Sequence, residues 1–177
     1  MTKSYTIRLA QSADVPALAA LKLHCFRETF GETGFAIPYP PADLAIFERE
    51  SYGEEKVASE LADAAHSTWV AEDGSGELVA YCHVGPAKVP HPECKEGDGE
   101  LYQLYLKASA QGAGLGKKLL DLGLDHLEAQ GRPIWLGVWQ GNLKAQHVYA
   151  GRGFAIVGEY QFAVGDWLDD EFIMRRG

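Results

Sequence analysis

The glycine-rich turn at residues 111–116, Gln-Gly-Ala-Gly-Leu-Gly, constrains this chain more than any other segment. A run rich in Leu and Tyr, residues 100–107, precedes it, and a run with helical apolar spacing, residues 115–130, follows it. A glycine-rich turn that opens a helix exposes backbone N–H groups at the positive end of the helix dipole. The segment therefore predicts a strand, a turn and a helix in succession, with a turn suited to binding a phosphate or pyrophosphate.

Two familiar nucleotide-binding loops do not match this turn. A dinucleotide-binding fold needs Gly-x-Gly-x-x-Gly near the first strand, whereas these glycines alternate and lie two-thirds of the way along the chain. A Walker loop fails because Gln111 stands where its first glycine belongs and Lys118 where its Ser or Thr belongs. On the turn alone, a helix start whose glycines serve only tight turning stays an equal alternative.

The remaining apolar patterns predict strands and helices within one domain over residues 1–177. Strands are predicted at residues 5–9, 68–72, 78–84, 101–106 and 133–138, with a hairpin of residues 154–164 and 168–174. Helices are predicted from a cap at Ser12 to Gly31, and at residues 43–51, 54–64, 115–129 and 142–150. Residues 86–99 lack periodicity and are expected to form a long surface loop. This order favours an α+β fold or a mixed-sheet α/β sandwich.

Composition and charge exclude several classes of protein. The chain is 46% apolar, has a formal net charge of −9 and contains no apolar run long enough to span a membrane. The acidic charge argues against a nucleic-acid partner. It fits either a cationic substrate or a surface that is acidic for solubility alone. The first residues contain no apolar leader core, so we expect no membrane association and a cytoplasmic location.

The cysteines and histidines predict neither a disulfide framework nor a metal site. Cys25, Cys82 and Cys94 are few and odd in number. Cys82 with His83, and His91 with Cys94, match no standard zinc spacing. We therefore expect no metal and treat these side chains as ordinary strand and loop residues.

A second cluster lies at residues 138–154. Asn142, Ala145 and Tyr149 are separated by three and then four positions, which places them on one face of a helix. Asn is a good helix cap, and a tyrosine on such a face is more often core than catalytic. Taken singly, these residues predict no function.

Together the two clusters resemble the GNAT superfamily of N-acetyltransferases. Its phosphate-binding signature, Gln/Arg-x-x-Gly-x-Gly/Ala, is matched by Gln111, Gly114 and Gly116. Its second signature, Asn-x-x-Ala-x-x-x-Tyr-x-x-x-Gly-Phe, is matched by Asn142, Ala145, Tyr149, Gly153 and Phe154. The opening segment Ile7-Arg8-x-Ala10-x-x-x-Asp14 also looks like the first strand and helix of the family. The resemblance implies an α/β (α+β) fold with a mixed, mostly antiparallel central sheet, a splayed strand pair and helices on both faces.

A narrower similarity is to bacterial polyamine (spermidine/spermine) acetyltransferases of the PaiA type. It rests on four short segments: Phe26-x-x-Thr29-Phe30-Gly31, Ala42-Asp43-Leu44, Trp135-Leu136-Gly137-Val138-Trp139 and Phe162-x-x-Gly165-Asp166. The expected reaction transfers an acetyl group from acetyl-CoA to a primary amine, with a small amine or polyamine favoured. The alternatives are an enzyme of this fold that acetylates a protein N-terminus or lysine, and a non-catalytic acyl-CoA-binding module. Members of the superfamily are often dimers, so a homodimer is a further expectation.

The resemblance also assigns the coenzyme site. Backbone N–H groups of the turn would hold the pyrophosphate of acetyl-CoA, from Gln111, Gly112, Ala113, Gly114, Leu115, Gly116 and Lys117. Lys117 and Lys118 either add charge near the 3′-phosphate or form a solvated helix start. Leu104, Tyr105 and Leu106 would splay from the neighbouring strand and pair with the pantetheine arm, to which Asn142 would also hydrogen-bond.

Two catalytic roles follow from the chemistry of amine acetylation. A thiolate leaves, and Tyr149 is the expected proton donor because a phenol stays protonated at pH 7. The attacking amine must lose a proton, and the resemblance implies Glu100 as the base, because it starts the central strand, where some members of the family place a carboxylate. A solvated strand end is the alternative for Glu100. The rival acids are Glu28, Glu159 and those at residues 166–171. The acceptor is expected between residues 24–39 and the final hairpin, beside Phe30, Phe35, Tyr39 and Tyr160.

Overall fold

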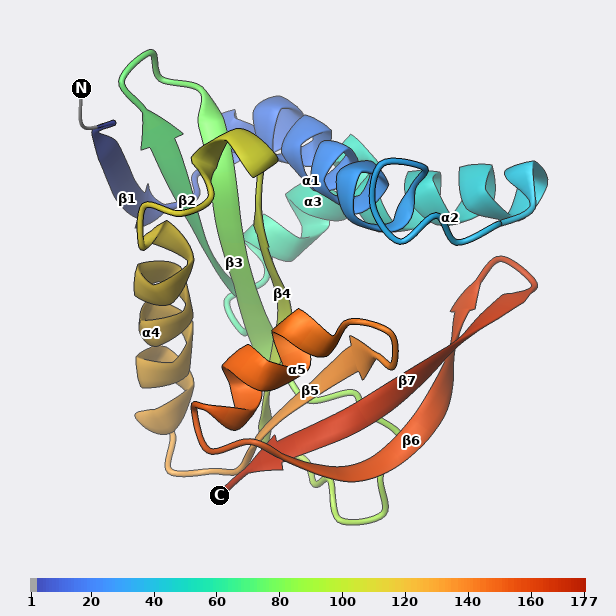
Figure 1. Ribbon diagram of the computed structural model, residues 1–177. Coiled ribbons are helices and arrows are strands. Elements are labelled where there is room, and N and C mark those ends of the chain that lie inside the picture. The colour runs from blue at the N-terminus through green and yellow to red at the C-terminus, as the bar shows by residue number, and fades with distance from the viewer. Residues whose placement is uncertain (1–2) are drawn as a thin grey trace.

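The predicted apolar runs form seven strands of one sheet in the computed structural model, which describes residues 3–177 (Figure 1). The strands are β1 (Tyr5–Leu9), β2 (Ser67–Asp73), β3 (Leu78–Pro86), β4 (Gly99–Leu106), β5 (Ile134–Trp139), β6 (Ala155–Val164) and β7 (Trp167–Arg176). Their order in the sheet is β1-β2-β3-β4-β5-β7-β6. Every neighbouring pair is antiparallel except β4 and β5. The expected mixed, mostly antiparallel sheet is confirmed.

Helices cover both faces of this sheet, as expected. The helical segments are η1 (Ser12–Asp14), α1 (Val15–Phe30), α2 (Pro41–Tyr52), α3 (Glu54–Ala62), η2 (Ala108–Ala110), α4 (Leu115–Glu128) and α5 (Leu143–Ala150). Helices α1 and α3 lie on one face, and α4 and α5 lie on the other (Figure 1). Met1 and Thr2, the start of the segment expected to lack a leader, are outside the described residues.

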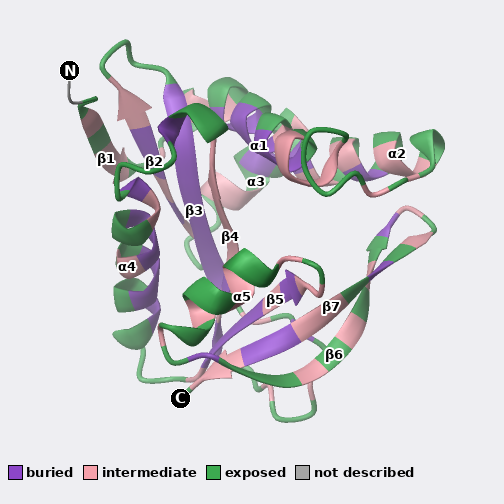
Figure 2. Ribbon diagram, in the orientation of Figure 1, coloured by how far each residue is buried: buried purple, intermediate pink, exposed green. Residues whose placement is uncertain are grey.

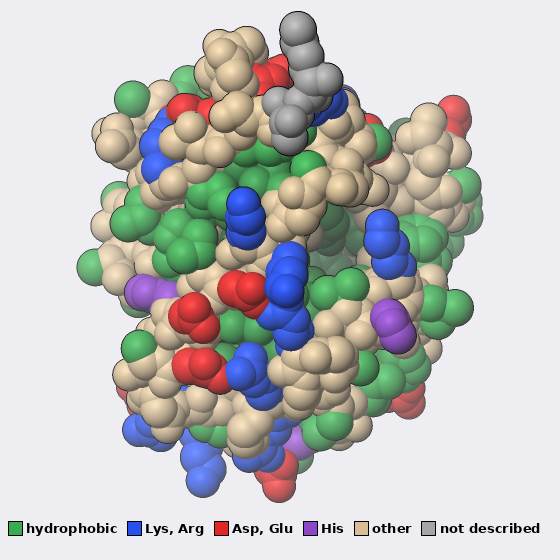
Figure 3. Space-filling view, turned by 60° about the vertical axis from the view of Figure 1, so that its left-hand side comes forward, with side chains coloured by type: hydrophobic (Ala, Val, Ile, Leu, Met, Phe, Trp, Pro, Cys, Tyr) green, Lys and Arg blue, Asp and Glu red, His purple; other side chains and the backbone are tan. Residues whose placement is uncertain are grey.

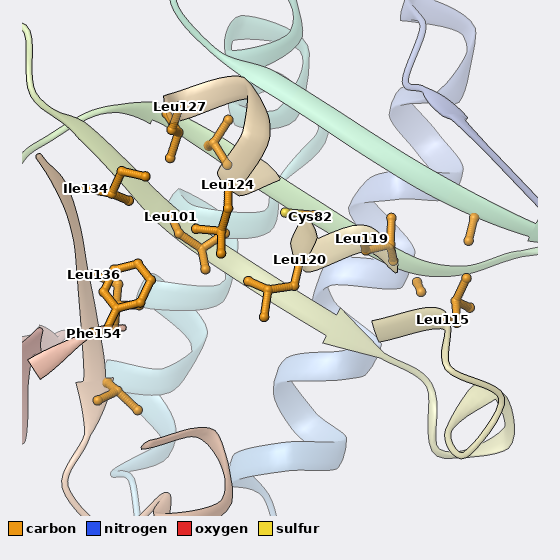
Figure 4. Close-up of a cluster of buried hydrophobic side chains, with 14 of the residues drawn as sticks. Cys82, Leu101, Leu115, Leu119, Leu120, Leu124, Leu127, Ile134, Leu136 and Phe154 are labelled. Carbon is orange, nitrogen blue, oxygen red and sulfur yellow. The ribbon is translucent and has the colours of Figure 1, made fainter. Parts of the chain in front are cut away.

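Strand β3 forms the centre of the core, and Figure 2 shows it buried along nearly its whole length. At residues 80–82 its side chains alternate: Ala80 and Cys82 pack with the α4 cluster, and Tyr81 packs with the α1 cluster. Figure 4 shows the leucines of α4 pointing at the sheet. A Cβ on Gly123 would lie 2.8 Å from Sγ of Cys82, so a glycine is needed for this close helix–sheet contact.

Two local expectations are wrong. Ser12 does not cap α1; it opens the short turn η1, and the carboxylate of Asp14 instead accepts a 2.7 Å hydrogen bond from the backbone N–H of Gln11. The loop at 86–99 is not wholly a surface loop, because Asp98 is 3% exposed and accepts a 2.9 Å hydrogen bond from the indole of Trp135. A buried carboxylate needs such a partner, so this contact fixes the end of the loop to β5.

Strands β4 and β5 separate after a short contact. They pair only at Gly99 with Ile134 and at Glu100 with Trp135. Beyond these pairs β4 follows β3, with Tyr102 as an extra residue in a bulge, and β5 follows β7. Within residues 3–177, no strand pairs with the β5-facing edge of the rest of β4. The expected splayed strand pair is present, and its open backbone edge faces the space between the two strands.

Candidate active site

A cavity of about 540 Å³ occupies the place where β4 and β5 diverge. On the coenzyme side predicted from the sequence, it is lined by Leu104, Tyr105, Asn142, Ala145 and Tyr149. On the opposite side, it is lined by residues of α1, α2, the connection between them and the β6–β7 hairpin. The fold thus brings segments from most of the chain around one space.

The glycine-rich turn lies between β4 and α4, as predicted. Gly112 and Gly114 have φ angles of +83° and +74°, which L-residues with side chains rarely adopt. A Cβ at either position would meet no heavy atom within 4 Å, so backbone conformation rather than space requires glycine here. Gly114 is the cap residue of α4. The first N–H groups of a helix have no acceptor within it, so the turn presents donors that could bind an anion.

The other residues of the turn differ in exposure. Gln111, Ala113 and Lys117 are exposed, whereas Leu115 is buried beneath α4. A Cβ on Gly116 would lie 3.3 Å from a methyl group of Leu106, so the end of β4 and the start of α4 are in close contact. Lys118 is also exposed. The turn therefore combines exposed backbone donors with two exposed cations on the first turn of α4.

The three expected arm-binding residues of β4 divide between two environments. Leu104 and Tyr105 line the cavity, and Leu106 lies outside its lining. Side chains of Leu104 and Leu106 pack on the α4 side, and that of Tyr105 packs on the α1 side. This alternation packs β4 on both faces of the sheet, while its free backbone edge stays available for pairing.

Helix α5 brings Asn142 and Tyr149 to the cavity. Asn142 is the cap of the helix: its Oδ1 accepts a 3.1 Å hydrogen bond from the backbone N–H of Ala145. The side-chain amide nitrogen of Asn142 can still donate a hydrogen bond. Burial raises the pKa of Tyr149 above that of a free phenol, so this side chain keeps its proton at neutral pH. A proton donor must carry its proton before the reaction, and the phenol of Tyr149 does so.

Glu100 lines the cavity and is not a solvated strand end. Its Oε1 accepts hydrogen bonds from the backbone N–H groups of Lys88 and Val89, at 2.8 and 3.0 Å. Burial raises the pKa of Glu100, and these two bonds oppose that effect because they stabilise the charged carboxylate. Glu100 therefore anchors the loop after β3 while it faces the cavity.

The fold places some of the rival acids in the cavity lining and others outside it. Glu28 accepts a 3.0 Å hydrogen bond from the backbone N–H of Ala108 and lies outside the cavity lining. Glu159 is exposed on β6. Asp169 and Glu171 both line the cavity from β7. Sequence reasoning named this stretch without selecting a residue, although positions 169 and 171 of a strand necessarily share a face.

Glu171 has an unusual environment among these acids. The hydroxyl of Tyr160 donates a 2.7 Å hydrogen bond to its Oε2. Burial raises the pKa of Glu171 to about 7, with a smaller contribution from the negative charges of Asp169 and Glu100, while the Tyr160 hydrogen bond lowers it. A carboxyl group with a pKa near neutrality can exchange a proton at physiological pH.

The side of the cavity that was predicted to bind the acceptor is aromatic. Phe30, Tyr39 and Tyr160 line it as expected. Phe35 does not: it packs against Trp139, with ring centroids 4.7 Å apart, outside the lining. Six further aromatic residues line the cavity without having been named from the sequence as lining it: Phe26, Phe47, Tyr52, Tyr102, Trp139 and Phe162. Four of them, Phe26, Phe47, Tyr52 and Phe162, belong to α1, α2 and the hairpin. Their apolar periodicity marks them as core, and only the packing of α1 and α2 against the hairpin reveals the cavity.

A buried polar cluster at one end of the cavity was also missed. Lys22, which is 1% exposed, donates a 3.1 Å hydrogen bond to Glu60. His83 lies 3.4 Å from the same carboxylate and 2.9 Å from a ring nitrogen of His66. Burial, with the nearby charge of Lys22, lowers the pKa of His83 to about 2, so the ring is neutral. A lysine on the apolar face of a predicted helix is the one sequence signal that could have indicated this cluster.

Residues 3–177 contain no group of three or more His, Cys, Asp or Glu side chains placed to hold a metal ion. In the same range, no helix is both long and apolar enough to cross a membrane.

On the face in Figure 3, basic side chains lie close to acidic ones. The net charge of −9 is thus not gathered into one acidic patch on that face.

Comparison with known proteins identifies the family. The sequence model of the acetyltransferase (GNAT) family matches residues 26–154, which include both motifs. An uncharacterised N-acetyltransferase of Lactobacillus delbrueckii subsp. lactis is 29% identical over 168 residues, covering 92% of this chain and 91% of that protein. An L-methionine sulfoximine/L-methionine sulfone acetyltransferase of Pseudomonas aeruginosa is 28% identical over 174 residues, covering 96% of this chain and 93% of that protein.

A solved structure has the same fold. The PaiA N-acetyltransferase from Thermoplasma acidophilum, in complex with coenzyme A, superimposes with a TM-score of 0.73 over 98% of both chains, at 21% identity. An identity this low shows a common fold and does not select a polyamine branch. The expected enzyme class, an N-acetyltransferase, is confirmed by the family match and the curated relatives together. From its two motifs, its splayed sheet and this match over most of its length, the chain belongs to the acetyltransferase (GNAT) family.

Proposed function

We propose that this enzyme, acting as one domain, transfers the acetyl group of acetyl-CoA to a primary amine of a small molecule by direct attack, with polyamines as the favoured acceptors. The observation that supports this most is the single cavity between β4 and β5, which is bordered by Tyr149 on one side and by carboxylates and aromatic rings on the other. A direct transfer needs donor and acceptor in one space, because proximity supplies much of the rate enhancement.

The coenzyme side of the cavity suits an acyl-CoA. The turn from Gln111 to Lys117 would bind the pyrophosphate through backbone N–H groups, and Lys118 would add positive charge. The open edge of β4 at Leu104 and Tyr105 would pair with the amide groups of the pantetheine arm. The amide nitrogen of Asn142, whose oxygen is occupied by the helix cap, would donate to the same arm.

The chemical step then needs one proton donor and one base. The acceptor nitrogen attacks the thioester carbon, the C–S bond breaks, and Tyr149 protonates the departing sulfur. The base would be one of the carboxylates that line the same cavity, among which Glu100 is the one predicted from the sequence. The acetyl carbonyl would be polarised by backbone N–H groups of β4.

Charge on the acceptor side supports a cationic substrate. Four carboxylates line the cavity, those of Glu60, Glu100, Asp169 and Glu171. Aromatic rings beside them can bind ammonium groups and alkyl chains. A polyamine combines several ammonium groups with an alkyl chain, and it therefore matches this lining better than a neutral amine does.

An amino-acid acceptor is the second candidate. Lys56 and Lys88 line the cavity together with the carboxylates, so the site could bind a substrate carboxylate as well as an amine. The Pseudomonas aeruginosa relative, an acetyltransferase for L-methionine sulfoximine and L-methionine sulfone, has such a substrate.

An acceptor screen with free-thiol detection tests the proposal. Purified protein and acetyl-CoA are incubated with spermidine, putrescine, L-methionine sulfone and a set of peptides with free N-termini or lysines. We expect the highest kcat/KM with spermidine. Turnover of peptides alone would assign the enzyme to protein acetylation. Acetyl-CoA binding by calorimetry, without transfer to any acceptor, would assign a binding module.

A further inference from the structure

Two carboxylates of β7 enter the cavity side by side, and each accepts a hydrogen bond from a tyrosine. Asp169 accepts bonds from Tyr39, at 2.6 Å, and from the indole of Trp167, at 2.9 Å. Among the described residues, Glu171 accepts a single hydrogen bond, from Tyr160 to Oε2. Its Oε1 therefore stays available to a ligand in the cavity, whereas both oxygens of Asp169 are occupied.

Strand β5 is shaped to accommodate the Tyr160–Glu171 pair. Gly137 lies on β5 beside β7, and a Cβ at that position would lie 2.5 Å from the hydroxyl of Tyr160 and 2.8 Å from Oε2 of Glu171. Any larger residue would displace the hydrogen-bonded pair. The absence of a side chain at Gly137 thus lets the carboxylate lie close to β5, and the cavity lies where β5 separates from β4.

The other cavity carboxylates are more strongly stabilised in their charged form. Glu100 receives two backbone N–H groups on Oε1, and Glu60 receives the ammonium group of Lys22. Hydrogen bonds from N–H groups and contacts with a cation both favour the carboxylate over the carboxylic acid. Glu171 has neither kind of partner among the described residues, so direct contacts from N–H groups or cations do not stabilise its charged form.

We infer that Glu171 is the catalytic base of this acetyltransferase, with Tyr160 as its positioning residue. This inference rests on the proposed function and replaces Glu100 by Glu171 in the proton transfer. Glu100 and Asp169 keep the cavity negative, so the acceptor enters as an ammonium ion and gives one proton to Oε1 of Glu171.

The proton balance of the reaction is complete with these groups. The neutral amine forms the new C–N bond as the C–S bond breaks, and Tyr149 gives its proton to the sulfur. The second proton of the attached nitrogen restores the Tyr149 phenol through solvent, and Glu171 releases its proton to bulk water. The products are the acetylated amine, coenzyme A and one proton.

The titration of Glu171 supports this role. Tyr160 faces it from β6, Asp169 from β7 and Glu100 from β4, while its β5 neighbours Gly137 and Trp139 have no titratable group. The phenols near it from the other elements are those of Tyr39 before α2, Tyr52 of α2 and Tyr105 of β4. Burial and the two carboxylates raise the pKa to about 7. A base is most effective when its pKa lies near the working pH.

The test is the pH dependence of kcat/KM with spermidine, measured from pH 5 to 9 by free-thiol release. For the unaltered enzyme we expect activity to rise with pH through an apparent pKa near 7. Glu171→Gln should lower kcat/KM at pH 7 by about 10²- to 10⁴-fold and remove this rise. The Glu100→Gln and Asp169→Asn variants should keep the rise of kcat/KM with pH. Glu159→Gln, an exposed acid on β6, is the matched control and should retain full activity.

Tyr160→Phe separates positioning from a merely structural role. Loss of its hydrogen bond removes a stabilising partner of the carboxylate, so the rise in activity should shift to higher pH while the plateau at pH 9 falls by no more than about tenfold. Acetyl-CoA affinity by calorimetry checks that each variant is folded. A rise in activity that survives in Glu171→Gln, or disappears in Glu100→Gln, would overturn the inference. No turnover of any acceptor by the unaltered enzyme would instead contradict the proposed function.

Discussion

The hydroxyl of Tyr39 donates a 2.6 Å hydrogen bond to the carboxylate of Asp169, although 130 residues separate them in the chain. Tyr39 precedes α2, and its ring also stacks against Phe26 of α1, with centroids 6.0 Å apart. Asp169 lies on β7. The bond therefore connects the helical segment on the acceptor side of the cavity to the C-terminal hairpin.

Tyr39→Phe should loosen that side of the cavity. A hydrogen bond to a charged group contributes about 1.5–3 kcal/mol, so we expect the free energy of unfolding in urea to fall by about 1–2 kcal/mol. The KM for the acceptor should rise more than kcat falls, because the ring lines the site and the hydroxyl holds it. Tyr5→Phe, on the edge strand β1, is the matched control. Equal effects of the two substitutions would show that the Tyr39 bond has no special role.

Tyr149→Phe tests the proton donor. The substitution keeps the ring and removes the acidic proton, so kcat should fall by about 10²-fold or more. The dissociation constant of acetyl-CoA, measured by calorimetry, should change by less than about threefold, because in the proposed site backbone groups would bind most of the coenzyme. If kcat were unchanged, another group would have to protonate the thiolate.

Gly114→Glu tests the coenzyme site. The new side chain brings negative charge and bulk to the donors of the turn, and we expect loss of measurable acetyl-CoA binding in calorimetry. Gly131→Glu is the matched control. Gly131 follows the other end of α4, has a φ of +66° and also has open space at its Cβ position. Both substitutions place a side chain in the left-handed region, at a cost of about 1–2 kcal/mol. Weakened binding in both variants alike would point to instability rather than to the site.

The pKa of Glu171 predicts a pH-dependent stability. A folded-state pKa of about 7, above the ordinary 4.5, means that the folded protein binds the proton more tightly than the unfolded chain. The stabilising contribution is then complete below pH 4.5 and is lost as the pH rises through 7, by at most about 3 kcal/mol. Urea unfolding from pH 5 to 8 should show this loss in the unaltered enzyme and a smaller one in Glu171→Gln. Parallel curves would mean that Glu171 titrates normally.

Sequence patterns predicted the local elements well because their causes are local. The helix predicted at residues 115–129 is α4, Leu115–Glu128, since both its apolar period and its glycine turn lie within the segment. The predicted hairpin is β6 and β7 for the same reason. By contrast, Phe35 was expected in the cavity and packs on Trp139 instead, because its surroundings come from β5.

The division between sequence and tertiary structure follows from the range of each interaction. The positive φ angles of Gly112 and Gly114 and the cap of α5 by Asn142 depend on a few consecutive residues, so the amino-acid order alone determined them. The choice among the acids depended on the sheet. Glu171 reaches the cavity because β7 pairs with β5, where Gly137 leaves room for the carboxylate and for the hydroxyl of Tyr160 that donates to it. The β5–β7 pairing joins two segments that α5 and β6 separate in the chain, so no local pattern could predict it.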